Sequence, residues 1–284
     1  MMRTSRIGQV SAVAAALAVL VASPAVYARQ TRAGAPPAKP PVTQAPPSPA
    51  VPSDRQVPFP IGELLTYDVS YSGFISAGTA TLHVVERRPP TGRGAYDIVA
   101  EAIPSKALAI VHQMYYKLET LLDTVALTPQ MAVTYANETG KIKTKTTKWT
   151  GAKTVDYTIQ TNVTVTEKRT LDAGTQDPLS LIYFLRAAMN NPIMQDGRTV
   201  PIPFTDAGDM YYLNAKVAAR ETLKTPAGTF PALRVTSTVL DAKRQPMIGR
   251  KLTVWLSDDA RRLPLKFETS LAIGSFVLTL SKVQ

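Results

Sequence analysis

The feature that most constrains the fold of this chain is an alternation of apolar and polar residues with a period of two. In LLTYDVSY (residues 64–71) every second residue is apolar, and GTATLHVVE (residues 78–86) repeats the pattern. Such alternation is typical of a strand with one buried face. About fourteen runs of this kind, rich in Thr, Val and Tyr and separated by Gly, Pro and Asp, follow Phe59. The sequence therefore predicts a mainly β fold, in which one large antiparallel sheet curls into a half-barrel or barrel because strand twist accumulates.

Two segments favour helix. In QDPLSLIYFLRAAMNNP (residues 176–192), Asp177 suits the N-cap, Pro178 the first helical position, and the Asn pair before Pro192 the end. This predicts one main helix over about residues 178–190, apolar on most of its surface and largely buried. A weaker pattern predicts one or two helical turns over about residues 105–113. Neither segment is long enough for a domain, so we expect the main helix to plug or flank the sheet.

The first 58 residues do not have the strand pattern. Residues 1–28 resemble a signal peptide, with a basic start, an apolar run over residues 10–22 and small residues before Ala28. The run is shorter than the roughly 20 residues that a spanning helix needs, although an uncleaved N-terminal anchor is the alternative. Residues 29–58 are rich in Pro and Ala and predict a disordered tether, or a merely tolerated leader. Residues 59–284 are then a single β-rich domain, exported to the periplasm.

Composition narrows the chemistry. The chain has no Cys, which excludes thiol nucleophiles, zinc–thiolate sites and a lipid-modified N-terminal cysteine, so a lipoprotein is not expected. Its two histidines, His83 and His112, are too few for a three-His metal site. Ser105 and Lys106 are merely adjacent, which does not place an amine on the hydroxyl. We therefore predict no catalytic residues, no metal site, no cofactor and no enzymatic activity. The formal charge of +11 favours acidic partners, which in a cell envelope are anionic membranes or glycans rather than nucleic acid.

One charged cluster invites a catalytic interpretation. VWLSDDARRLPLKFE (residues 254–268) holds adjacent carboxylates, Asp258 and Asp259, and adjacent arginines two residues later. Acid–base pairs need two different environments, whereas both residues are expected at a solvated turn, which Asp favours. LETLLDTVALTPQMAVTY (residues 118–135) has the same order of strand, Asp, turn, Pro and strand. What repeats is a type of turn and not a catalytic motif.

Two sets of side chains are candidates for binding. Lysines at alternate positions of KIKTKTTK share one face of a strand, where they could dock on an anionic surface or protect an exposed sheet edge from pairing. Aromatic residues could line the concave face of a curved sheet, either as ordinary core or around a ligand with apolar tails. The candidate docking residues are Lys141, Lys143 and Lys145; the candidate ligand-binding residues are Tyr67, Tyr71, Phe74, Tyr183, Phe184 and Trp255.

Four motifs in order give the chain a family resemblance. They are IGELLTYDVSYSGFISAGTATLHV, DPLSLIYFLR, TPAGTFPALRV and VWLSDDARRLPLKFE. Together they resemble the exported bacterial domain of unknown function 3108. The resemblance implies a large curved antiparallel sheet with a helical element, and it carries no catalytic residues, because the family has no established activity. The strand–turn–Pro–strand unit is also distantly similar to units in half-barrel carriers of lipids and lipoproteins in the bacterial envelope.

The hypothesis that follows is a periplasmic, non-enzymatic binding or envelope-maintenance protein, whose curved sheet holds a lipid or lipoprotein ligand. A scaffold for envelope proteins or peptidoglycan, with a packed core, is the alternative. A hydrolase is a more distant one, and it requires two acids or a Ser–Lys pair converging in one cleft.

Overall fold

The structure is a computed structural model that describes residues 53–89, 94–111, 113–191, 194, 197–206, 208–271 and 274–284. The predicted signal peptide and most of the predicted tether lie outside these residues, as does His112. Within the described ranges, no helix has both the length and the apolar character needed to cross a bilayer.

Fourteen strands form one antiparallel sheet. The first eight are β1 (Leu64–Tyr71), β2 (Ile75–Arg88), β3 (Ala95–Pro104), β4 (Met114–Asp123), β5 (Pro129–Glu138), β6 (Lys141–Trp149), β7 (Thr154–Gln160) and β8 (Thr164–Thr170). The other six are β9 (Val200–Asp206), β10 (Asp209–Thr225), β11 (Gly228–Leu240), β12 (Pro246–Ser257), β13 (Pro264–Leu271) and β14 (Gly274–Val283). The mainly β fold class and the approximate strand number predicted from the sequence are confirmed.

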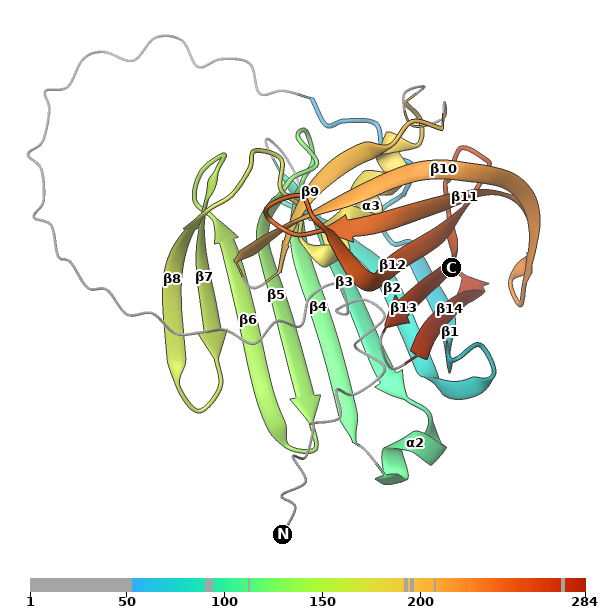
Figure 1. Cartoon of the computed structure of the whole chain (residues 1–284), viewed down its shortest axis with the longest axis horizontal. Helices are drawn as coiled ribbons and strands as arrows, with labels where there is room; N and C mark the ends of the chain where they lie inside the picture. The colour runs from blue at the N-terminus through green and yellow to red at the C-terminus, as the bar shows by residue number, and fades with distance from the viewer. Residues whose placement is uncertain are drawn as a thin grey trace, which may run out of the picture.

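The sheet consists of two meanders, β1–β8 and β9–β14, joined where β1 pairs with β14. Strands β8 and β9 are neighbours in sequence but do not pair, so they are the two edges of the sheet. The sheet curls strongly, and β9–β11 cross in front of the wall formed by β3–β5 (Figure 1). It is therefore an open, barrel-like sheet, as the accumulation of twist predicts.

Helix α3 (Pro178–Ala188) lies inside this curl, against β3, β4 and β9. Its start is the predicted one: Asp177 is the N-cap, accepts from the Leu179 and Ser180 amides, and forms a capping box with the Ser180 hydroxyl. The helix ends two residues earlier than predicted, with Met189 as its C-cap. The short helix α2 (Lys106–Val111) is also present, within the predicted range of 105–113.

The edge strand β9 is contacted by residues from the interior of the curled sheet. The Gln176 amide donates to the Pro203 carbonyl at 2.9 Å, and its carbonyl accepts from the Thr205 amide at 2.8 Å, which forms a parallel bridge. On the same edge, Asp206 forms an ion pair with Lys145 of β6 at 2.9 Å. Gln176, which precedes the N-cap of α3, and Lys145 of β6 thus hold β9 in place, and part of the unpaired backbone of β9 is satisfied.

Residues just before Phe59, which were predicted to belong to the tether, contact the domain. Asp54 accepts two hydrogen bonds from the Arg87 guanidinium, at 2.7 and 2.9 Å, and a third from the Thr124 hydroxyl. Val57 packs against the apolar core. The last residues assigned to the tether are therefore part of the domain's surface.

Candidate functional site

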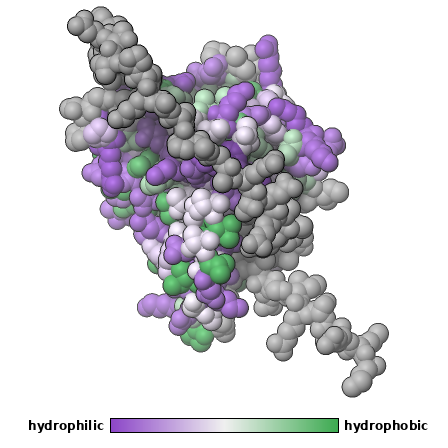
Figure 2. Space-filling model, turned by 90° about the vertical axis from the view of Figure 1, so that its left-hand side faces the viewer, coloured by the Kyte–Doolittle hydropathy of each residue, from purple (hydrophilic) through white to green (hydrophobic). Residues whose placement is uncertain are grey.

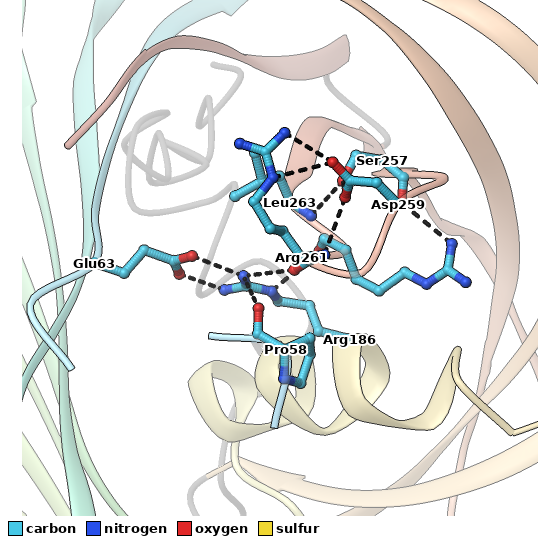
Figure 3. A network of polar contacts seen from close by, with 8 residues as sticks. Pro58, Glu63, Arg186, Ser257, Asp259, Arg261 and Leu263 are labelled. Atoms are coloured by element: carbon cyan, nitrogen blue, oxygen red, sulfur yellow. Dashed lines mark hydrogen bonds and ion pairs between the residues drawn. The ribbon is translucent and has the colours of Figure 1, made fainter. Parts of the chain in front are cut away.

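A buried arginine lies at the centre of the molecule, close to the C-terminal end of α3. Arg186 is fully buried, and its two terminal nitrogens bind the two carboxylate oxygens of Glu63 at 2.6 and 2.9 Å (Figure 3). Two of its nitrogens also donate to carbonyls: Nε to Arg262 at 3.1 Å, and Nη2 to Arg261 at 3.0 Å and to Pro58 at 3.3 Å. A charge can be buried only when it is paired and hydrogen-bonded in this way.

This cluster joins three parts of the chain that are far apart in sequence. The guanidinium also lies over the rings of Phe59 and Tyr183, 5.3 and 5.4 Å from their centroids. Arg186 thereby connects α3 to the segment before β1 and to the β12–β13 turn. Every nitrogen of the guanidinium has a protein partner, so its role is to hold the helix in the curl.

The charged turn at residues 257–263 is structural, as predicted. Partial burial raises the pKa of both carboxyls, but hydrogen bonds from Arg262 and Arg220 to Asp258, and from Ser257 to Asp259, outweigh it and hold both pKa values below the usual range. Two ionised carboxylates with low pKa values do not form an acid–base pair.

The repeat seen in the sequence is a repeat in backbone geometry. Leu127 and Arg262 each lie two residues before the proline of their turn, and each has a positive φ, of 52° and 47°. The carbonyl of each accepts a hydrogen bond from a side chain at one end of α3: Gln176 donates to Leu127 at 3.1 Å, and Arg186 to Arg262. The two equivalent turns therefore hold the two ends of the helix.

An apolar pocket of about 220 Å³ lies between α3, β9 and the N-terminal segment. Of its described lining residues only Arg55 is charged, and only Asn191 is otherwise polar; the rest are Leu127, Phe184, Ala187, Ala188, Met194, Val200 and Ile202. Arg55 is exposed and has no ion pair among the described residues. Apolar walls with one cationic group suit an acyl chain with an anionic head, although the volume is below the roughly 300–1,000 Å³ of most ligand sites.

Two other hollows have different character. One of about 620 Å³, at the β4–β5 and β6–β7 turns, is lined by Trp149 together with polar groups that include Asp123 and Gln130. The other brings together Asp177 and Asp206, but its volume is about 10 Å³, room for no more than about one water. Burial raises the pKa of both carboxyls, and each already has a structural partner.

The lysine row does not form an outward docking face. The register places Lys141, Lys143 and Lys145 opposite Glu138, Ala136 and Thr134, on the face of the sheet that points toward α3. Burial, followed by the neighbouring charge of Lys145, lowers the pKa of Lys143. Protection of a sheet edge is also wrong as an explanation, since β6 is flanked by β5 and β7. The alternation of lysines in the sequence showed that they share one face of the strand, but it could not show whether that face lies on the concave side of the sheet.

The six candidate aromatic residues are not brought together. Tyr67 and Tyr183 are fully buried core residues, and the Tyr67 hydroxyl donates to the Pro264 carbonyl at 2.8 Å. Tyr71 packs on Phe276 beside the β1–β2 turn, whereas Phe74 is 80% exposed at its tip.

Trp255 lies on the opposite face of the sheet from Tyr67. Trp255 pairs with Lys266 in the register of β12 with β13, and the Lys266 ammonium is 4.5 Å from the centroid of the Trp255 ring. The indole N–H of Trp255 donates to Glu221. Only Phe184 of the six lines one of these three hollows. Sequence reasoning missed Arg55 and Trp149, because neither lies in a motif that indicates binding.

Ser105, which the sequence places beside Lys106, has a structural role. The Ser105 hydroxyl accepts from the Leu108 amide and donates to the Ser76 carbonyl, as a cap of α2. Among the described residues, no three His, Asp or Glu side chains are grouped so as to hold a metal ion.

Comparison with known proteins identifies the family and the fold. The family model described as protein of unknown function (DUF3108) matches residues 66–281. A beta-barrel-like protein of the DUF1849 domain of unknown function from Brucella abortus has 11% identity and a TM-score of 0.50, over 79% of this chain and 97% of its own. A Parabacteroides distasonis protein, provisionally described as a lipoprotein, has 8% identity and a TM-score of 0.32, over 82% and 100%. No curated protein matches the sequence. The likeness to the Brucella abortus structure indicates a barrel-like fold, and neither it nor the family model assigns an activity.

Proposed function

This chain belongs to the DUF3108 family, and we propose that it is a non-enzymatic periplasmic binding protein for an anionic amphiphile. The observation that supports the proposal is the pocket beside α3, whose described lining is apolar except for Asn191 and the unpaired cation of Arg55. The apolar part would take up an acyl chain, and Arg55 would bind a carboxylate or phosphate head. The basic start, apolar run and small-residue end of residues 1–28 support the location.

The ligand suited to this pocket is a short or partly inserted chain. The walls come from α3 on one side and from Val200 and Ile202 of β9 on the other, so a modest movement of the β9 edge would enlarge the space. A single fatty acyl chain fits this arrangement better than a whole phospholipid.

The test is ligand uptake by the full chain after delipidation and refolding. We expect saturable binding of a fluorescent fatty acid, displaced by unlabelled fatty acid, and acyl lipids in the native preparation by mass spectrometry. The substitution Ala188→Phe, which fills the pocket, should abolish uptake. Arg55→Glu should weaken binding of the acid about tenfold, and that of the matching alcohol much less.

Two controls make the outcome decisive. Lys224→Glu reverses an exposed charge on the remote β10–β11 hairpin and should leave uptake unchanged. Thermal unfolding of Ala188→Phe verifies that the variant is folded. A folded wild-type protein that neither binds fatty acid nor carries acyl lipid would contradict the proposal.

That contrary result would support the second candidate, an envelope scaffold. It is favoured by one specific observation: the centre of the curl is filled by Tyr67, Tyr183 and the Arg186 cluster, all fully buried. A packed centre leaves the protein's outer surface as its means of interaction.

A further inference from the structure

Exposed apolar side chains gather at one end of the sheet. Eight large apolar residues are exposed among the described residues, and two of them, Ile61 and Val283, lie at the end of the sheet where β1 begins and β14 ends. The other six are Phe74, Ile75, Ile103, Ile110, Ile142 and Val163. Single exposed apolar residues are ordinary, but six of eight at one end are not a scattered set.

The topology places these six at the same end. The β1–β2 turn, α2, the β5–β6 turn and the β7–β8 turn all connect strands at the end opposite Ile61. They form the lower edge of the wall in Figure 1, and green apolar groups appear among purple ones at the lower end of Figure 2. From β1 to β6 this edge spans about 24 Å at the usual strand spacing. We call it the apolar rim.

Two of the turns in the rim have the backbone conformation of tight hairpin turns. The β1–β2 turn has positive φ at Ser72 and Gly73, 50° and 81°, and the β5–β6 turn has 53° and 82° at Thr139 and Gly140. Two consecutive positive φ values are typical of the type I′ turns that connect antiparallel strands. The residue that follows the first turn is Phe74, which is 80% exposed, and α2 presents Ile110, which is 86% exposed.

The rim is basic as well as apolar. Residues 72–76, 103–111, 139–142 and 161–163 contain Lys106 and Lys141 and no Asp or Glu. Both lysines are exposed. The other end of the sheet differs, since it carries acids and arginines joined to each other, such as Asp259 with Arg261 at 2.7 Å.

We propose that the apolar rim docks on an anionic lipid bilayer, with Phe74 and Ile110 inserted at the level of the head groups and Lys106 and Lys141 on the lipid phosphates. A row of separate tips suits a soft, flat surface better than it suits a protein groove, which needs a continuous complementary face. The charge matches anionic lipid. This docking is independent of the ligand pocket, which lies beside α3, and of the lysine row it uses only Lys141, the first residue of β6 after the β5–β6 turn.

The test is flotation of the full chain with vesicles of phosphatidylcholine alone or mixed with an equal part of phosphatidylglycerol. Wild type should bind the mixed vesicles, more weakly as salt is raised. The double substitution Phe74→Ser/Ile110→Ser should reduce binding by about tenfold or more. Lys106→Glu/Lys141→Glu should abolish the preference for phosphatidylglycerol.

The matched control is Ile61→Ser/Val283→Ser, which removes the two exposed apolar residues at the other end and should bind as wild type does. All variants share the same N-terminal residues, so differences among them report on the rim. Thermal unfolding verifies that each is folded. The proposal would be overturned if Phe74→Ser/Ile110→Ser bound vesicles as well as wild type does, or if the control variant lost as much binding as that variant. It would also be overturned if wild type bound neither kind of vesicle.

Discussion

Arg186 and Glu63 form a bidentate ion pair in the interior of the domain, although 123 positions separate them in sequence. The arginine comes from α3 and the glutamate from the residues just before β1. Their pairing positions the helix relative to the strand that joins the two ends of the chain, because β1 pairs with both β2 and β14. The helix cannot shift along the curl without leaving a buried charge unpaired.

Replacement of Arg186 should therefore be among the most destabilising changes. Arg186→Met leaves the Glu63 carboxylate buried without its partner, and we expect a loss of about 3–5 kcal/mol in the free energy of unfolding. The double variant Arg186→Met/Glu63→Met removes both charges and should recover part of that loss. Urea unfolding of the single and double variants measures the coupling. Additive effects of the two substitutions would show that the pair is not coupled.

Asp177 gives a second prediction, which depends on pH. Its Oδ1 accepts from the amides of Leu179 and Ser180 and from the Thr120 hydroxyl, whereas Oδ2 is buried without a partner among the described atoms. Asn keeps the accepting oxygen. We therefore expect Asp177→Asn to be within about 1 kcal/mol of wild type at pH 7, and Asp177→Ala to cost about 2 kcal/mol through loss of the cap.

The pH dependence of that difference has a definite sign. Burial raises the pKa of Asp177 above its usual 3.8, so the folded chain binds this proton more tightly than the unfolded chain does. The free energy of unfolding of wild type should rise relative to Asp177→Asn as the pH falls through the folded pKa, and level off below the unfolded one. Unfolding titrations at several pH values measure this slope. A difference that is constant with pH would show that the carboxyl is not perturbed.

Some elements of this fold can be predicted from the sequence because their signals are local. The N-cap at Asp177 followed by Pro178 and the alternation in β1 depend on neighbouring residues, and both are present as predicted. The two Pro-terminated turns could likewise be matched to each other by their spacing alone.

The buried Arg186 cluster and the direction of the candidate binding residues could not be predicted from the sequence, because they depend on contacts between residues far apart in the chain. No residue near Arg186 in the sequence indicates that it pairs with Glu63. The family motif that ends at Arg186 shows that an arginine is present, but not which residue it contacts. Alternation shows that Tyr67 and Val69 share a face, but not that Trp255 lies on the other face, since that depends on the register of β12 with β13. The inward direction of the lysine row depends in the same way on how the sheet curls.

A third prediction concerns the β9 edge. Lys145 of β6 binds both oxygens of Asp206 at 3.0 and 2.9 Å. Lys145→Met should leave this carboxylate buried without its partner and loosen the β9–β10 hairpin, which hydrogen–deuterium exchange would show as faster exchange in β9 and not in β12. Because burial raises the pKa of Asp206, mild acid should protonate it and partly restore protection in the variant. Lys153→Met, at an exposed position before β7, is the control.

A fourth prediction tests a glycine of the first family motif. Gly78 of β2 has a φ of 156°, and a Cβ built there would lie 2.1 Å from the Ile103 carbonyl oxygen, which belongs to the backbone of the neighbouring strand and cannot rotate away. Gly78→Ala must therefore separate β2 from β3 beside the β1–β2 bulge, and we expect a loss of roughly 2–4 kcal/mol in the free energy of unfolding. Gly140→Ala is the matched comparison: its φ of 82° is strained, but a Cβ there meets nothing within 4 Å, so its cost should be about 1 kcal/mol. Thermal and urea unfolding of the two variants separate the effect of contact from that of backbone strain. A Gly78→Ala protein as stable as Gly140→Ala would mean that the two strands can move apart without loss of core packing.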